Sequence, residues 1–245
     1  AKVGRIFAGK GPAGTSDPVE YSCQQNFALL TTDGFWNTDQ ESDVQNINGG
    51  QIGNQDGGAT ARPKYEGPVA STNSLADVAK YYYETDIRNS SFNNCTGALG
   101  NDVCTNNVFT SAKDPNNKQH MTTYTLGLGV DGELRYRPDY ASAGTGDFAK
   151  IRNGLLNWPE PVSNTNSAVD DLWHAAVNGG GSYFSAKDPA QLTRSLTASL
   201  NEISAKTASG GGAGTSSLNP VGGNNYAYIS SYTSVKWQGN IERRT

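Results

Sequence analysis

The alternation of short apolar runs with helix-like segments constrains the fold of this 245-residue chain more than any other feature. Three runs are apolar or β-branched and predict short buried strands: 26–32, 121–130 and 182–186. Three segments have helical spacing of apolar residues: about 75–88, 167–178 and a long one from Pro189 onward. Strands that alternate with helices build a parallel sheet with helices on its faces, so the sequence predicts an α/β fold.

Polar residues mark where these helices begin. Ser74 with Asp77, and Ser167 with Asp170, have the three-residue spacing of a capping box. Asp188 precedes Pro189, a residue tolerated in the first turn of a helix. The three helix starts are therefore predicted at these positions.

Three parallel strands leave one sheet edge and much apolar surface open. We therefore expect the missing strands to come from residues upstream of Ala1 or from another chain, which makes this the C-terminal half of a doubly wound domain. The chain begins Ala1-Lys2-Val3-Gly4, without an initiating Met or a signal peptide, so we expect a piece of a longer protein.

Polar segments separate the predicted elements. The chain is 35% hydrophobic and 17% charged with 29 Gly, and both fractions lie below the globular norms of about 45–50% and about 25%. We expect residues 1–22 to be irregular or to form one short extended segment. We expect 35–70 and 89–118 to be long surface insertions, and 205–225 to be a flexible Gly/Ser linker. Beyond it, 226–232 and 234–237 read as strands of a separate β segment.

Several classes of function are disfavoured. The net charge is −4 with no Lys/Arg stripe, so nucleic acid is not expected as a partner. No run approaches the roughly 18 apolar residues of a transmembrane segment. Two His and three Cys at scattered positions do not suggest a zinc site.

Asp33 follows the first predicted strand in Thr31-Thr32-Asp33-Gly34. Ligands of open α/β sheets bind beyond the carboxyl ends of the strands, and a carboxylate beside hydroxyls suits Mg²⁺ or Ca²⁺. The alternative is that the Asp33 side chain bonds the backbone of its own turn.

Three blocks of sequence resemble the PilC/PilY family of type IV pilus tip adhesins. They are YSCQQNFALLTTDGFWN at 21–37, QHMTTYTLGLG at 119–129, and VDDLWHAAVN at 169–178 followed by GSYFSA at 181–186. With their connecting regions they cover residues 20–204, and their order is similar to the second half of a von Willebrand factor A (Rossmann-type) domain. The resemblance implies three parts: a half domain over 1–204, the linker, and the first strands of a β-propeller over 226–245.

The resemblance also implies a function without enzymatic activity. It predicts an extracellular adhesin and pilus-assembly factor at the pilus tip or bacterial cell surface, which binds minor pilins and host or abiotic surfaces and supports twitching motility. It implies a metal-ion-dependent adhesion site for Mg²⁺ or Ca²⁺ in which Asp33 is one ligand. The Asp-x-Ser-x-Ser element of such a site is absent from these 245 residues.

The surface location implied by the resemblance also bears on the cysteines. Cys95 and Cys104 enclose a short polar loop, and an oxidising compartment favours a disulfide between them. Cys23 is interpreted either as a small core residue or as the partner of an upstream Cys.

Two alternatives to the adhesin remain open. One is a structural scaffold in which Asp33 binds nothing. The other is a secreted hydrolase that uses Asp170 and Asp171, although neighbouring helix residues point about 100° apart. Asp170 and His174 share a helical turn, but a structural histidine is the favoured interpretation because no nucleophile is identifiable.

Overall fold

The computed structural model describes residues 1–36, 44–111, 114–207, 213–215, 227–233 and 238–244. The chain divides into a larger unit, 1–200, and a smaller one, 201–245. Each unit is described by itself. None of the helices in the described ranges is both long and apolar enough to span a bilayer.

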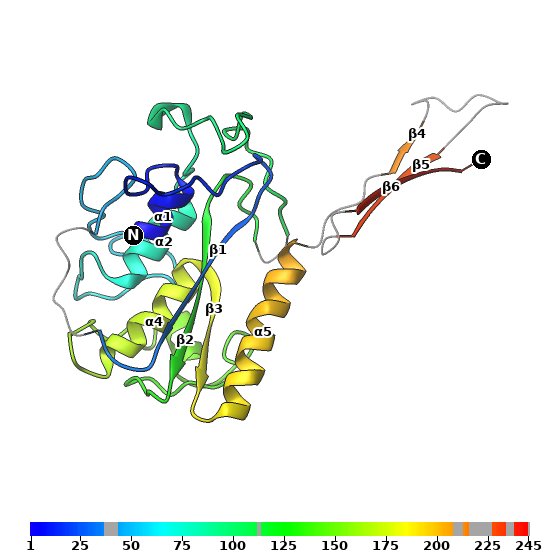
Figure 1. Cartoon of the computed structure of the whole chain (residues 1–245). Helices are drawn as coiled ribbons and strands as arrows, with labels where there is room; N and C mark the ends of the chain where they lie inside the picture. The colour runs from blue at the N-terminus through cyan, green and yellow to red at the C-terminus, as the bar shows by residue number, and fades with distance from the viewer. Residues whose placement is uncertain (37–43, 112–113, 208–212, 216–226, 234–237, 245) are drawn as a thin grey trace. The chain divides into compact units, whose positions relative to one another are not determined.

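A three-stranded parallel sheet forms the centre of the larger unit (Figure 1). Its order is β1 (Asn26–Thr32), β2 (Met121–Leu128) and β3 (Gly180–Ala186), with Asn26 opposite Met121 and Leu126 opposite Phe184. The predicted strand at 26–32 is confirmed, β2 ends two residues early, and β3 starts two residues early. The α/β fold class is therefore confirmed, with an all-parallel open sheet of the Rossmann type.

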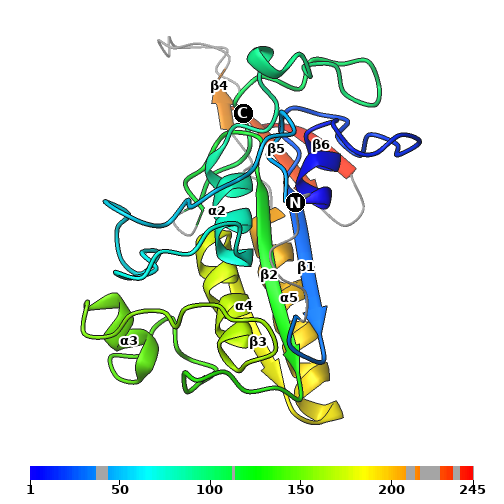
Figure 2. The ribbon, with the colours of Figure 1, turned by 90° about the vertical axis from the view of Figure 1, so that its left-hand side faces the viewer.

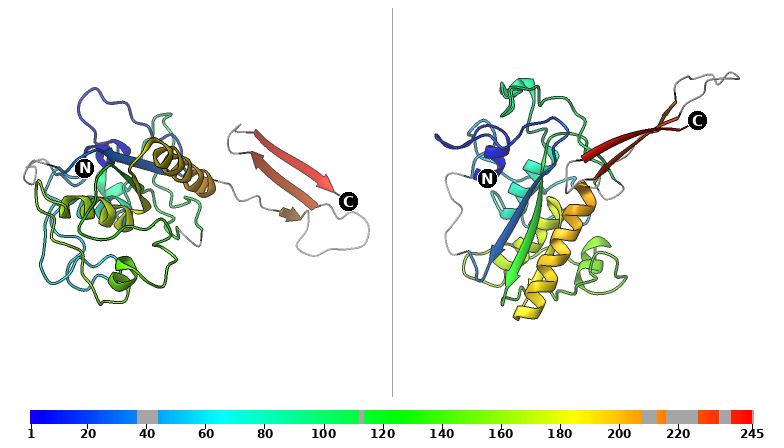
Figure 3. Two further views of the ribbon diagram at one scale, coloured as in Figure 1. Left: turned by 90° about the horizontal axis from the view of Figure 1, so that it is seen from below. Right: turned by 45° about the vertical axis from the view of Figure 1, so that its right-hand side comes forward.

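Helices α2 (Leu75–Glu84) and α4 (Ser167–Asn178) lie side by side on one face of this sheet (Figure 2). Viewed from below, α5 (Pro189–Thr207) runs on the opposite side of the strands from α4 (Figure 3). Two short helices, α1 (Lys2–Phe7) and α3 (Asp147–Arg152), and the 3₁₀ turn η1 (Ser90–Phe92) lie outside this framework. Helices thus cover both faces of the sheet.

The capping residues confirm two predicted helix starts and correct the third. Helix α5 begins at Pro189 as predicted, and the Asp188 carboxylate accepts a hydrogen bond from the Gln191 amide. Ser74 and Asp77 form the complete capping box of α2, which ends at Glu84 rather than near residue 88 because Thr85 is extended. The N-cap of α4 is Asn166, without a side-chain bond. Asp170 cannot serve α4, since its carboxylate accepts hydrogen bonds from the backbone of the 133–134 loop.

The apolar interior forms two clusters. In the first, Trp173 of α4 stacks on Tyr183 of β3 and on Phe148 of α3. In the second, Tyr82 of α2 packs with Met121 of β2 and with residues from the N-terminal segment and the first insertion. Burial against these clusters, rather than intrinsic propensity, positions the short elements.

Two sequence expectations are wrong in the second cluster. Residues 1–22 were expected to be irregular or extended, yet α1 forms there and places Gly4 against the Tyr82 ring. It was missed because it has six residues and no capping side chain. The insertion at 35–70 is not confined to the surface, since Ile47 and Ile52 are buried in the cluster.

Strand β1 is an edge strand of the sheet. Leu29 and Leu30 point to opposite faces, as successive strand residues do, and remain 38% and 40% exposed. In the described part of the chain, no strand pairs with the outer edge of β1. The backbone of β1 is therefore available for a further strand.

The smaller unit contains an antiparallel sheet of β4 (Ala213–Thr215), β5 (Ala227–Thr233) and β6 (Gln238–Arg244). The range 205–225, predicted to be a linker, differs from that expectation: α5 continues to Thr207, and β4 pairs with β5. Ladder hydrogen bonds to β5, which side-chain composition does not reveal, account for β4. The strand predicted at 234–237 lies outside the described residues.

Candidate functional site

Asp33 lies directly after the carboxyl end of β1, and its side chain is exposed. The following turn is closed by Thr32, whose hydroxyl accepts a hydrogen bond from the Gly34 amide (3.3 Å). Within the described part of the chain, the Asp33 carboxylate has no hydrogen-bond partner. The alternative in which Asp33 itself bonds its turn is therefore wrong.

Two other carboxylates at this edge of the sheet are already engaged. Asp131, after β2, forms an ion pair with Lys187, after β3 (2.7 Å). Asp188 accepts a hydrogen bond from the Gln191 amide at the start of α5 (2.8 Å). The described residues at this edge thus offer few free protein oxygens besides Asp33 to Mg²⁺ or Ca²⁺, which take six or more oxygen ligands, water included. They do not by themselves fit a divalent cation.

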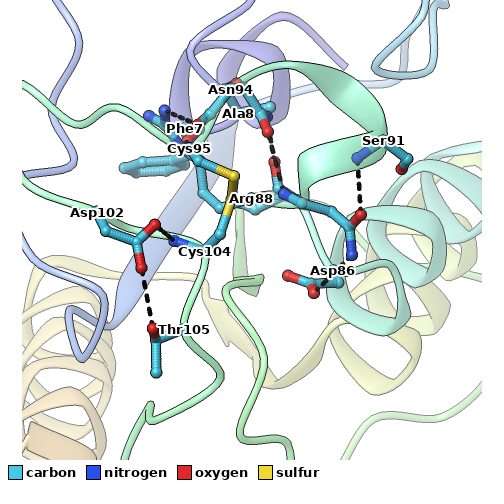
Figure 4. The surroundings of a disulfide bond; sticks show 12 residues. Phe7, Ala8, Asp86, Arg88, Ser91, Asn94, Cys95, Asp102, Cys104 and Thr105 are labelled. Atoms are coloured by element: carbon cyan, nitrogen blue, oxygen red, sulfur yellow. Dashed lines mark hydrogen bonds between the residues drawn. A yellow bond between two sulfur atoms is a disulfide. The ribbon is translucent and has the colours of Figure 1, made fainter.

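Cys95 and Cys104 are joined by a disulfide in the segment that follows η1 (Figure 4). Asp102, beside it, accepts hydrogen bonds from the Cys104 amide (3.1 Å) and the Thr105 hydroxyl (3.0 Å). Cys23 is a free, exposed thiol, so its interpretation as a core residue is wrong.

The same region contains one possible cluster of metal ligands. Of the His, Cys, Asp and Glu side chains in the described ranges, Cys95, Asp102 and Cys104 place their ligand atoms within 4.8 Å of one another. Metals bind the thiolate form of cysteine, and the disulfide uses both sulfurs. The cluster could therefore hold a metal only in the reduced chain.

Asp170 and Asp171 do not face each other across a substrate. Asp170 accepts hydrogen bonds from the amides of Glu133 (2.7 Å) and Leu134 (3.2 Å). Asp171 accepts hydrogen bonds from the amides of Leu75 and Ala76, at the start of α2 (2.9 and 3.1 Å). Burial raises the pKa of each carboxyl to about 7, against the lowering effect of these bonds. Both carboxylates hold backbone segments in place.

A small hollow lies next to Asp170, between α4 and the carboxyl ends of β2 and β3. Its walls include Tyr136, Trp173, Tyr183 and Ser185. The space open to the centre of a water molecule is about 10 Å³, which is room for about one water. The buried Trp173 Nε1 has no acceptor among the described residues.

His174 faces the first insertion rather than Asp170. Its Nε2 lies 2.8 Å from the Lys64 carbonyl oxygen, which can only accept, so Nε2 carries the hydrogen. Desolvation lowers the pKa of His174 to about 3, and the imidazole is neutral at physiological pH. A structural role follows, with Trp158 stacked on the ring (4.5 Å between centroids).

The carboxylates of the first insertion were not recognised from the sequence. Asp56 and Glu66 are buried, Asp56 next to His174 and Asn178 of α4, and Glu66 against Ser71 and Asn54. The only available signal was their placement in Gln55-Asp56-Gly57-Gly58 and Tyr65-Glu66-Gly67, which reads as ordinary loop sequence.

The sheet is all-parallel and open, with helices on both faces and a polar site beyond its carboxyl edge. These features define an α/β domain of the Rossmann type, consistent with a von Willebrand factor A-like fold. Comparison with known proteins narrows this class. The chain belongs to the PilC/PilY family.

Three relatives from Pseudomonas aeruginosa carry the name type IV pilus biogenesis factor PilY1. Those from strains PAK and PAO1 are both 36% identical, over 203 and 205 residues, which is 79% of this chain and 17% of each relative. The one from strain UCBPP-PA14 is 31% identical over 260 residues, 99% of this chain and 22% of the relative. The chain thus spans about a fifth of the length of these relatives. No family model and no solved structure matches it.

Proposed function

We propose that this chain is part of a type IV pilus biogenesis factor that acts without enzymatic activity outside the cell, at the pilus tip, as an adhesin and assembly factor. The observation that carries the proposal is the 31–36% identity to relatives named type IV pilus biogenesis factor. The use of Asp170, Asp171 and His174 in backbone contacts supports the non-enzymatic part, because the groups suggested for a hydrolase are already occupied.

The second insertion, 89–118, is the part proposed to contact minor pilins. It exposes two large apolar side chains, Leu99 (55%) and Phe109 (49%). Loops held by a rigid framework are where recognition concentrates, and here the disulfide and the bonds of Asn94 to Ala8 and Ile87 supply the rigidity.

The contact surface is tested by Leu99→Asp combined with Phe109→Asp in the full-length protein. We expect weaker co-purification of minor pilins and fewer surface pili by electron microscopy. Leu155→Asp is the matched control, since Leu155 is 77% exposed but lies outside the insertion. Equal pilin binding and equal pilus number in both variants would refute the proposed contact between the second insertion and minor pilins.

Asp33 is proposed as one ligand of a Mg²⁺ or Ca²⁺ ion in a metal-ion-dependent adhesion site, with the other ligands supplied by residues outside those described. Its position at the carboxyl end of β1 and its unengaged carboxylate support this role. In the full-length protein, Asp33→Ala should reduce surface attachment, twitching and calorimetric binding of Mg²⁺ or Ca²⁺. Asp139→Ala, at another exposed carboxylate, is the control. Unchanged attachment and metal binding would favour the structural scaffold.

A further inference from the structure

The contact between Asp56 of the first insertion and Asn178 of α4 has an unusual hydrogen-bond pattern. Both residues are fully buried. One carboxylate oxygen, Oδ2, accepts a hydrogen bond from Asn178 Nδ2 at 2.6 Å. The second carboxylate oxygen of Asp56 and the amide oxygen of Asn178 have no donor among the described residues. This side-chain pair therefore contains two buried acceptor oxygens that receive no hydrogen bond from the described residues.

Among the described residues, no positive charge compensates Asp56. The groups that face it are Asp77 at the start of α2, Glu66 of the insertion, and Asp171 and His174 of α4. His174 Nε2 lies 3.4 Å from Asp56 Oδ2, but it directs its hydrogen to the nearer Lys64 carbonyl oxygen (2.8 Å). Desolvation lowers the pKa of His174, which disfavours a charged imidazolium beside Asp56. Arg62, whose charge acts on His174, directs its guanidinium to Leu156 and Asn157. An ionised Asp56 would thus be a buried carboxylate among carboxylates, which is costly.

A divalent cation is not the compensating group. The neighbouring carboxylates are filled by donors: Asp77 accepts from the amides of Gln55 and Ser74, and Asp171 from those of Leu75 and Ala76. Within the described ranges, the three-ligand cluster is at Cys95, Asp102 and Cys104, not here. A proton, by contrast, can be shared between the two oxygens that lack a partner, Asp56 Oδ1 and Asn178 Oδ1.

We propose that Asp56 is a neutral carboxylic acid in the folded chain, and that its O–H donates to the amide oxygen of Asn178, so that a two-point acid–amide pair fastens the 44–73 segment to α4. The carboxyl then accepts through Oδ2 and donates through Oδ1, and both orphaned oxygens are satisfied. Loss of this proton would leave two acceptors and a negative charge in the contact, so the attachment of the segment depends on pH.

The direction of the dependence follows from linkage. Burial, then the charges of Asp77 and Glu66, raise the pKa of Asp56 to about 8. Because the folded pKa lies above the unfolded one, the stabilisation is complete below about pH 4, is lost as pH rises toward 8, and changes no further above that. His174 acts oppositely, since its lowered pKa destabilises the folded state as pH falls below about 6.5.

Amide hydrogen exchange of residues 54–57, measured in the whole 245-residue chain, gives the opening constant of this segment. A comparison of wild type with Asp56→Asn then isolates the contribution of Asp56 to the pH dependence of opening. The side-chain amide that this substitution introduces can donate to Asn178 but does not titrate, while His174 is common to both proteins. We expect the ratio of the opening constants, wild type over variant, to rise about tenfold per pH unit between pH 5 and 7, which is about 100-fold in total. Asp139→Asn, at an exposed carboxylate, should follow wild type.

A ratio that stays within about twofold over this range would overturn the proposal. Carbon-13 NMR of the Asp56 carboxyl in the wild-type chain gives a second, independent result that does not depend on the variant folding. A titration above pH 7 is the expected outcome. A titration near pH 4, the ordinary range of an aspartate, would show an ionised carboxylate and refute the acid–amide pair.

Discussion

Removal of the Cys95–Cys104 disulfide should destabilise the larger unit by an amount set by loop entropy. The native loop does not depend on the sulfur bond alone, because Val103 donates to the Cys95 carbonyl, Gly97 to Asn101 and Ala98 to Val19. The variant Cys95→Ala/Cys104→Ala should therefore keep the folded loop, and its cost should arise in the unfolded chain.

The magnitude follows from the separation of nine positions between the two cysteines. A cross-linked ring of roughly ten residues removes about 9 cal/mol/K of unfolded-state entropy, or about 2.7 kcal/mol at 25 °C. Unfolding entropy near 2.1 cal/mol/K per residue gives about 0.4 kcal/mol/K for roughly 200 residues. The double variant should thus melt about 6 °C lower.

Urea unfolding followed by tryptophan fluorescence measures this difference, since Trp158 and Trp173 lie in the first core cluster. Wild type in the presence of reductant should match the double variant. A loss below about 1 kcal/mol would refute the entropic reasoning. Alkylation of both cysteines without reductant, detected by mass spectrometry, would refute the disulfide itself.

Two further substitutions test the cap of α2 and the close approach of β3 to β2. Ser74→Ala removes the side-chain acceptor of the α2 capping box and should cost about 1 kcal/mol in urea unfolding, with Ser74→Asn largely restoring stability; equal stability of the Ala variant would contradict the cap. Gly181→Ala should cost about 3 kcal/mol or more, because the added Cβ would lie 2.2 Å from the Thr123 carbonyl oxygen. Gly144→Ala, with open space around the new methyl group, should melt within about 1 °C of wild type; similar melting of both glycine variants would contradict the close approach.

The regular part of the fold could be predicted from the sequence because its signals are local. Apolar runs located β1 and β2 to within two residues, and Ser74 with Asp77 located the start of α2. Errors arose where tertiary contacts override local pattern. Asp170 has the spacing of a cap, but its carboxylate is drawn to the 133–134 loop, 36 or more positions away.

The candidate site was predictable only in part. The place of Asp33 at the carboxyl end of β1 follows from strand order alone, and the structure confirms that place. The groups that surround Asp33 cannot be predicted from strand order, because they depend on long-range contacts. Asp131 and Lys187, for example, pair across 56 positions. The buried role of Asp56 likewise depends on a contact between the first insertion and α4, 122 positions away.

The open edge of β1 has a consequence for handling this chain. A long edge strand with Leu29 and Leu30 partly exposed is a template for unintended pairing with other molecules. Aggregation during refolding should therefore begin at this strand, and a single charge such as Leu30→Lys should act as a gatekeeper that raises the soluble yield. The edge that is open to a further strand would then also be a weakly protected part of the described sheet in solution.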